Sequence, residues 1–76
     1  MPETEKNEAL LVLGKNMRRL REVQKVSQEA LAFNAGLDRA YVGGAERGER
    51  NITILSALKI SKALECELTD LVEGVR

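Results

Sequence analysis

Arginine and lysine side chains, which can bind phosphates and other anions, are concentrated in the middle of this chain. The 76 residues carry twelve basic and twelve acidic side chains, so the formal net charge is zero. Residues 15–50 hold eight basic and five acidic residues, a net charge of +3, whereas residues 1–14 carry −2 and residues 51–76 carry −1. The basic residues of the central segment are Lys15, Arg18, Arg19, Arg21, Lys25, Arg39, Arg47 and Arg50. This segment predicts either a binding face for a polyanion or an ordinary solvated helix surface.

Residues that usually carry out catalysis or bind metals are scarce. Cys66 is the only cysteine and the chain has no histidine, so no disulfide can form within it and a metal site would need carboxylates alone. A cysteine nucleophile usually needs a histidine partner, and the apolar context LECEL (residues 64–68) instead predicts that Cys66 is a small buried side chain. No glycine loop that could cradle a phosphate is present. We therefore expect no enzyme: no catalytic residues, no cofactor, no metal and no small-molecule ligand.

Length and composition predict one all-α domain spanning residues 1–76. A chain of 76 residues can bury a single modest core, and its 43% apolar and 3% aromatic residues suit helices better than a sheet. Residues 1–6 are charged and have no apolar period, so we expect a frayed tail there. No run approaches the roughly 20 apolar residues that span a bilayer, and the first residues do not form a signal peptide. These features predict a cytoplasmic protein without a membrane partner.

Apolar periodicity predicts a first helix over residues 7–24. Leu10, Leu13, Met17 and Leu20 recur at helical spacing and should face the core. Gly14 lies inside this helix, where glycine is less favourable than alanine by about 0.5–1 kcal/mol. We therefore expect that another segment of backbone packs closely against Gly14.

Two short capped helices are predicted next. Ser27 can cap a helix that runs to about residue 34, Gly36 ends it, and Asp38 can cap the following helix. The pairs that could act as hydrophobic staples at the two helix entries are Val26 with Leu31 and Leu37 with Val42. A helix, a turn containing glycine and a second capped helix match the layout of a DNA-reading helix-turn-helix, although any αα-hairpin could produce part of this pattern.

The last third of the chain predicts a fourth helix over residues 53–64 and a short fifth helix from Thr69. The residues of the fourth helix expected to face the core are Ile54, Ala57, Ile60 and Leu64. Several other apolar residues would leave more apolar surface than so small a protein needs for its core. They form either a homodimer face or the remainder of the core. The candidate dimer-face residues are Leu55, Leu58, Leu68, Leu71, Val72 and Val75.

Five segments in order resemble the lambda-repressor-like helix-turn-helix family, in particular the small controller proteins of restriction-modification systems. These segments are LGKNMRRLR (residues 13–21), SQEALA (27–32), AGLDRAYV (35–42), ERGERN (46–51) and ISKAL (60–64). The resemblance covers nearly the whole chain, and it rests on the order and spacing of all five segments. It implies a compact five-helix domain that acts as a sequence-specific transcriptional regulator. Such a protein would bind a short inverted repeat as a homodimer and could control restriction-modification genes, including its own.

The resemblance also implies which residues read bases. Arg39 and Tyr41, near the start of the third helix, would enter the major groove, and Arg39 could form a bidentate contact to O6 and N7 of a guanine. Ala40, Gly43 and Gly44 would lie on the same DNA-facing helix. The alternatives are a solvated Arg39 and a Tyr41 that packs its ring against the protein body.

Phosphate contacts are implied at both ends of the motif. Gln28, at the start of the second helix, would touch one phosphate, and Arg47 and Arg50 would hold phosphates beyond the third helix. Solvated arginines are again the alternative. Arg21 and Glu46 resemble the pair that ties the first helix to the third in this family, which is a structural role.

The chain departs from the family pattern on its reading helix. Gly43 stands where serine is usual, and Gly44 stands where a long polar side chain is frequent. Two glycines in place of alanines make the helix about 2 kcal/mol less favourable, and Ala45 and Ala57 are smaller than usual for the core. We therefore expect fewer base contacts, with DNA shape carrying more of the specificity. The alternative function is a protein-interaction module of the same fold, an antitoxin-like neutraliser that has lost strong DNA binding.

Overall fold

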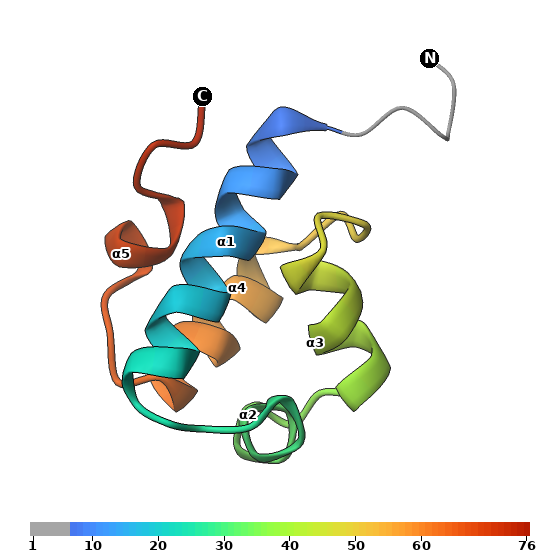
Figure 1. Cartoon of the computed structure of the whole chain (residues 1–76), viewed down its shortest axis with the longest axis vertical. Coiled ribbons are helices and arrows are strands. Elements are labelled where there is room, and N and C mark those ends of the chain that lie inside the picture. Colours follow the sequence, from blue (N-terminus) through green and yellow to red (C-terminus); the bar gives the residue numbers. More distant parts are fainter. Residues whose placement is uncertain (1–6) are drawn as a thin grey trace.

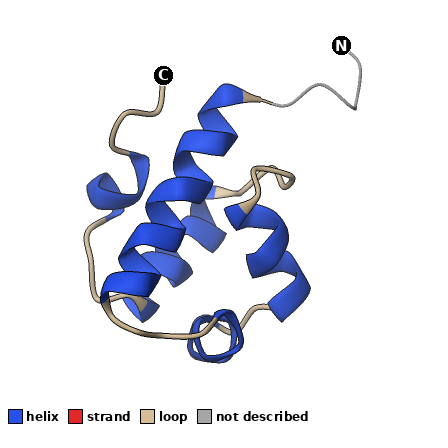
Figure 2. Ribbon diagram, viewed as in Figure 1, coloured by secondary structure: helices blue, strands red, loops and turns tan. Residues whose placement is uncertain are grey.

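The structure is a computed structural model that describes residues 7–76, and this part of the chain consists of helices and loops without a strand (Figure 2). The helices are α1 (Glu8–Val23), α2 (Gln28–Ala35), α3 (Arg39–Glu46), α4 (Ile54–Ala63) and α5 (Leu68–Val72). The predicted all-α, five-helix fold is confirmed. The predicted frayed tail at residues 1–6 lies outside the described residues.

The first helix matches its predicted range closely. The side chain of Asn7 accepts hydrogen bonds from the backbone N–H groups of Ala9 and Leu10, at 2.9 and 3.3 Å, and so caps the start of α1. Leu13 and Met17 are buried, while the other two residues predicted to face the core are half-buried and pack against it. The amphipathic pattern of this segment therefore identified its inward face.

Gly14 lies where α1 meets the end of α3. A Cβ atom at this position would come within 2.5 Å of the backbone oxygens of both Ala45 and Glu46. Such an approach is closer than any side chain tolerates, so only glycine allows the two backbones to meet here. The expectation of a close backbone neighbour is confirmed, and the contact fixes α3 against α1.

The helix-turn-helix is formed by α2, the three residues 36–38 and α3. Ser27 caps α2 by accepting a hydrogen bond from the N–H of Ala30 at 3.0 Å, and Gly36 ends α2 in the left-handed conformation at φ 70°. In Figure 1, α2 is seen almost end-on whereas α3 lies closer to the plane of the picture, so the two axes cross steeply. This arrangement turns the start of α3 away from the body.

The predicted side-chain cap of α3 is wrong in its detail. Asp38 occupies the N-cap position, but its carboxylate forms no capping hydrogen bond. The side chain is exposed, so water can solvate it in place of the helix amides. The first turn is held instead by the hydrogen bond from the N–H of Val42 to the backbone oxygen of Asp38, at 3.1 Å, and by the burial of Val42.

The fourth helix is confirmed, and Thr53 caps it, because its Oγ1 accepts from the N–H of Ser56 at 3.0 Å. Ala57, Ile60 and Leu64 are buried, but Ile54 is 68% exposed. The prediction that Ile54 faces the core is therefore wrong, because this residue lies in the first turn, before the helix reaches the core cluster.

The fifth helix begins one residue earlier than predicted, at Leu68, and the N–H of Glu67 donates to the carboxylate of Asp70 at 2.9 Å. Leu71 is only 1% exposed and belongs to the core cluster. It is thus excluded from the exposed apolar face that the sequence predicted.

The C-terminal segment is fastened to α1, which lies between α5 and α3 in Figure 1. The amide of Asn16 donates to the backbone oxygens of Leu71 and Glu73, at 2.7 and 2.8 Å. The amide of Gln24 donates to the backbone oxygen of Leu64. These bonds hold the end of the chain in place, so that α1 supports both the C-terminal helices and the helix-turn-helix.

Candidate nucleic-acid interface

The start of α3 carries the residues predicted to read bases. Arg39 and Ala40 are exposed and Tyr41 is half-buried. Among residues 7–76, no carboxylate lies within ion-pairing distance of the Arg39 guanidinium. The five N–H donors of that guanidinium are therefore accessible to an acceptor outside the protein, such as a guanine edge or a phosphate.

The segment after α3 adds two more exposed arginines. Arg47 donates to the carboxylate of Glu49 at 3.1 Å, but both side chains are more than half exposed, so this pair stabilises the fold little and can give way to a phosphate. The guanidinium carbon of Arg50 lies 5.8 Å from the centre of the Tyr41 ring. Arg50 and Tyr41 are nine residues apart in sequence, yet they form one surface on the outer side of α3.

A buried ion pair fixes the position of α3. The guanidinium of Arg21 donates to the two carboxylate oxygens of Glu46, at 2.7 and 3.0 Å, and to the backbone oxygen of Val26 at 2.9 Å. The two charged side chains are only 13% and 3% exposed. The hydrogen bonds to Glu46 raise the pKa of Arg21 above its ordinary value, against the lowering effect of burial. Arg21 therefore stays charged and joins α1, the turn before α2, and α3.

Gln28 extends this network through a contact that the sequence does not predict. Its side-chain amide donates to the Glu46 carboxylate at 3.0 Å, and the residue is half-buried. Gln28 is thus turned toward α3 in the free protein. The phosphate contact predicted for it remains a prediction that would use its second amide hydrogen or the N-terminus of α2. No sequence signal could reveal the partner, because the two residues are 18 positions apart.

Gly43 and Gly44 are both buried, although they lie on the helix expected to face DNA. The nearest atoms outside the helix backbone belong to Arg47 and Gln28 at Gly43, and to Arg50 at Gly44. Long side chains cover both residues in the free protein. The predicted place of the two glycines against DNA therefore remains a prediction, in which these side chains would lie between the helix backbone and the DNA.

Other candidate sites in the described residues offer less. Cys66 is half-buried against the core, and burial, together with the negative charges of Asp70 and Glu67, raises the pKa of its thiol. This disfavours the reactive thiolate. Within residues 7–76, no cluster of three or more histidine, cysteine or carboxylate side chains could hold a metal ion, and no helix is long and apolar enough to cross a membrane.

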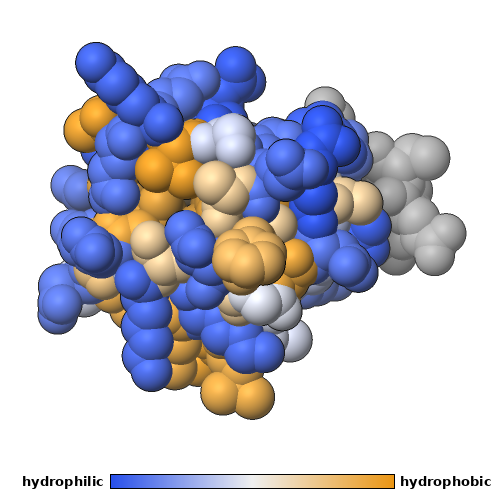
Figure 3. Space-filling view, turned by 90° about the horizontal axis from the view of Figure 1, so that it is seen from below, coloured by the Kyte–Doolittle hydropathy of each residue, from blue (hydrophilic) through white to orange (hydrophobic). Residues whose placement is uncertain are grey.

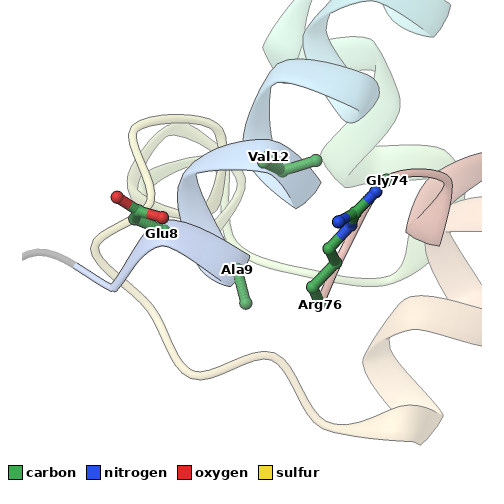
Figure 4. A pocket seen from close by; sticks show the side chains of 5 residues that line it. All are labelled: Glu8, Ala9, Val12, Gly74 and Arg76. Carbon is green, nitrogen blue, oxygen red and sulfur yellow. The ribbon is translucent and has the colours of Figure 1, made fainter.

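Two further surface features of the described residues are an open hollow and a lower face of mixed polarity. The hollow lies between the first turn of α1 and the C-terminal residues, and none of the predicted DNA-contacting residues lines it (Figure 4). Its lining residues are Glu8, Ala9, Val12, Gly74 and Arg76. Seen from below, where α2 lies, the surface is mostly hydrophilic with separate small hydrophobic patches (Figure 3). Neither feature forms a ligand site as well built as the α3 surface.

Known proteins with similar sequences have the same helix-turn-helix motif. Residues 17–71 match the sequence profile of the helix-turn-helix family. The chain is 40% identical to control protein C.SmaI of Serratia marcescens over 60 residues, which cover 79% of this chain and 71% of the relative. It is also 40% identical to control protein C.BamHI of Bacillus amyloliquefaciens over 68 residues, or 88% and 84% of the two chains.

Solved structures of restriction-modification controller proteins superpose on the described fold. C.AhdI of Aeromonas hydrophila gives a TM-score of 0.84 at 46% identity, covering 86% of this chain and 98% of that one. C.Esp1396I, solved as a tetramer with its natural operator, gives 0.83 at 33% identity, covering 92% of each chain. The chain therefore belongs to the helix-turn-helix family, and its relatives include the controller proteins of restriction-modification systems.

Proposed function

We propose that this protein is a sequence-specific transcriptional regulator that binds duplex DNA and controls restriction-modification genes, including its own. The proposal rests on the exposed Arg39 guanidinium at the start of α3, which has no ion-pair partner among residues 7–76. The buried Arg21–Glu46 pair holds α3 against the body. A helix N-terminus that projects an exposed arginine fits the major groove, where guanine presents two acceptors in one plane. The role is regulatory rather than enzymatic.

The relatives support this role. C.SmaI and C.BamHI are control proteins, C.AhdI and C.Esp1396I are restriction-modification controller proteins, and C.Esp1396I has been solved on its natural 35 base-pair operator. In this chain, Arg47, Arg50 and the start of α2 with Gln28 would contact phosphates on either side of the bases that Arg39 and Tyr41 read. As a regulator of genes, the protein would act in the cytoplasm, as one domain without a small-molecule effector.

We propose a homodimer as the unit that binds an inverted repeat. Leu55 is 71% exposed, Leu58 36% and Val72 40%, so these residues leave apolar surface on α4 and α5. Leu68 and Val75 are half-buried against the core and would border this surface. Burial of such apolar side chains against a second copy is favourable, and two-fold symmetry of the protein would match two-fold symmetry of the operator.

The substitution Arg39→Ala tests the function. Binding to the DNA upstream of the protein's own gene is measured by electrophoretic mobility shift at several salt concentrations. Arg39→Ala should weaken specific binding by about 5- to 150-fold, the value of one bidentate base contact. Arg18→Ala is the matched control, because Arg18 pairs with Glu22 on the exposed side of α1. Equal affinity of the Arg39→Ala variant and the wild type at every salt concentration would favour the interaction-module alternative.

A further inference from the structure

The two glycines of α3 are covered by the side chains of arginines that follow the helix. A Cβ atom on Gly44 would lie 3.0 Å from Nε and 3.1 Å from Cγ of Arg50. A Cβ atom on Gly43 would lie 3.3 Å from a terminal nitrogen of Arg47 and 3.4 Å from the side-chain oxygen of Gln28. The stem of Arg50 thus rests directly on the helix backbone at Gly44.

The end of α3 explains why Arg50 runs back along the helix. Gly48 has φ +76°, its N–H donates to the backbone oxygen of Ala45 at 3.1 Å, and the N–H of Glu49 donates to that of Gly44 at 2.9 Å. These two bonds form the Schellman arrangement that reverses the chain after a helix. Arg50 follows immediately and is therefore directed back over the last turns of α3.

Tyr41 and Gly44 are neighbours on one face of α3, because residues three apart in a helix lie one above the other. The stem of Arg50 crosses Gly44 and its guanidinium reaches the Tyr41 ring, 5.8 Å from the ring centre. A cation at this distance from an aromatic ring is attracted to the face of the ring. The exposed side chain of Arg50 and the half-buried ring of Tyr41 are thus already in contact in the free protein.

We infer that Gly44 is a positioning residue: its lack of a side chain lets Arg50 lie on α3 and against Tyr41, so that both side chains meet duplex DNA as one ordered unit. The inference deepens the proposed function and rests on it. A flexible arginine loses rotamer entropy when it binds, and ordering it in advance reduces that loss. Gly44 contributes no side chain to the surface of α3, and this leaves room there for the side chain of Arg50, from the segment that follows the helix.

Substitution of each glycine by alanine separates this role from helix propensity. Alanine is the better helix former, so Gly44→Ala and the matched control Gly43→Ala should each leave the Tm unchanged or raise it, by up to about 8 °C. Only Gly44→Ala places a methyl group against the stem of Arg50 and moves it from the ring. If Gly44 affected only the stability of the helix, Arg50 would keep its contact with the Tyr41 ring in both variants.

The first readout needs no DNA. The side-chain methylene protons of Arg50 should be shifted upfield in the NMR spectrum of the wild type by the ring current of Tyr41, the only tyrosine in the chain. The shift should disappear in Tyr41→Leu and in Gly44→Ala and persist in Gly43→Ala. An unshifted Arg50 in the wild type, or an equal shift in both glycine variants, would overturn the inference.

The second readout is affinity for the upstream DNA. Gly44→Ala should weaken binding by about two- to fivefold, the value of an exposed cation–π contact. The double variant Gly44→Ala/Arg50→Ala should bind no more weakly than Arg50→Ala, because the glycine acts through the arginine. Independent losses that add would overturn the inference. A wild type that binds no DNA would refute the proposed function. The NMR comparison would still show separately whether Arg50 lies against Gly44 and Tyr41.

Discussion

Arg21 and Glu46 join the first helix to the end of the third through two hydrogen bonds of 2.7 and 3.0 Å in a nearly dry environment. Gln28 donates to the same carboxylate, so the Glu46 side chain on α3 accepts hydrogen bonds from both α1 and α2. Burying a charged side chain without a partner of opposite charge is energetically costly. The position of α3, and of every side chain on it, therefore depends on this carboxylate.

We predict that Glu46→Ala strongly destabilises the protein. Removal of the carboxylate leaves the Arg21 charge buried without a partner, which should lower the free energy of unfolding by about 3–5 kcal/mol. Urea denaturation followed by circular dichroism measures the change. The control is Glu22→Ala, which breaks the exposed pair with Arg18 and should lower the free energy of unfolding by less than about 1 kcal/mol. Similar losses in the two variants would show that the buried pair does not hold α3.

A second prediction concerns the contact between α1 and α3. Gly14→Ala should lower the free energy of unfolding by about 1–3 kcal/mol or more, because its methyl group would press on the backbone oxygens of Ala45 and Glu46. Gly43→Ala makes the same exchange inside a helix where only the ends of side chains are near, so it should be neutral or stabilising. Thermal denaturation of both variants gives the comparison. A Gly14→Ala variant as stable as the wild type would contradict the close approach seen here.

Local patterns predicted most of the fold because they depend on neighbours in sequence. The cap at Ser27 and the turn at Gly36 set helix ends to within a residue or two, and Gly14 indicated a close backbone. The errors arose where tertiary packing decides. Periodicity could not tell that Ile54 lies beyond the core, or that Leu71 completes it.

The candidate site was predictable only in part. The resemblance pointed to Arg39 and Tyr41, and the structure places them in the first turn of α3, Arg39 exposed and Tyr41 half-buried. Contacts across the turn were not accessible from the sequence, since the positions of Gln28 beside Glu46 and of Arg50 over Gly44 follow from how three helices and a chain reversal meet. The sequence shows that Gly43 and Gly44 are poor helix formers inside a helix. Only the structure shows that the side chain of Arg50 lies over Gly44.

The third prediction tests the homodimer. Leu55→Glu combined with Leu58→Glu should weaken self-association at least tenfold, because two charged groups would enter the apolar contact proposed on α4. Sedimentation equilibrium measures the dissociation constant, and circular dichroism checks that the helices persist. Phe33→Glu is the matched control, since Phe33 is 84% exposed on α2, outside the proposed face. Unchanged association in the double variant, or equal weakening by Phe33→Glu, would place the interface elsewhere.

The last prediction concerns the pH dependence of Cys66. Burial raises the pKa of this thiol above its ordinary value of 9.0, and the negative charges of Asp70 and Glu67 add to the effect. The native state therefore holds the thiol proton more tightly than the unfolded chain. The resulting stabilisation is complete below the unfolded pKa and is lost as the pH rises through the native pKa.

Initial rates of alkylation by iodoacetamide, measured across pH, check this expectation. The midpoint of the rate profile should lie at higher pH for the native protein than for the same protein in urea, where Cys66 is solvated. Glu67→Gln should lower the native midpoint, because one of the charges that oppose thiolate formation is removed while the side chain keeps its size. A native midpoint at or below that of the unfolded chain would mean that Cys66 is not held against the core as the structure places it.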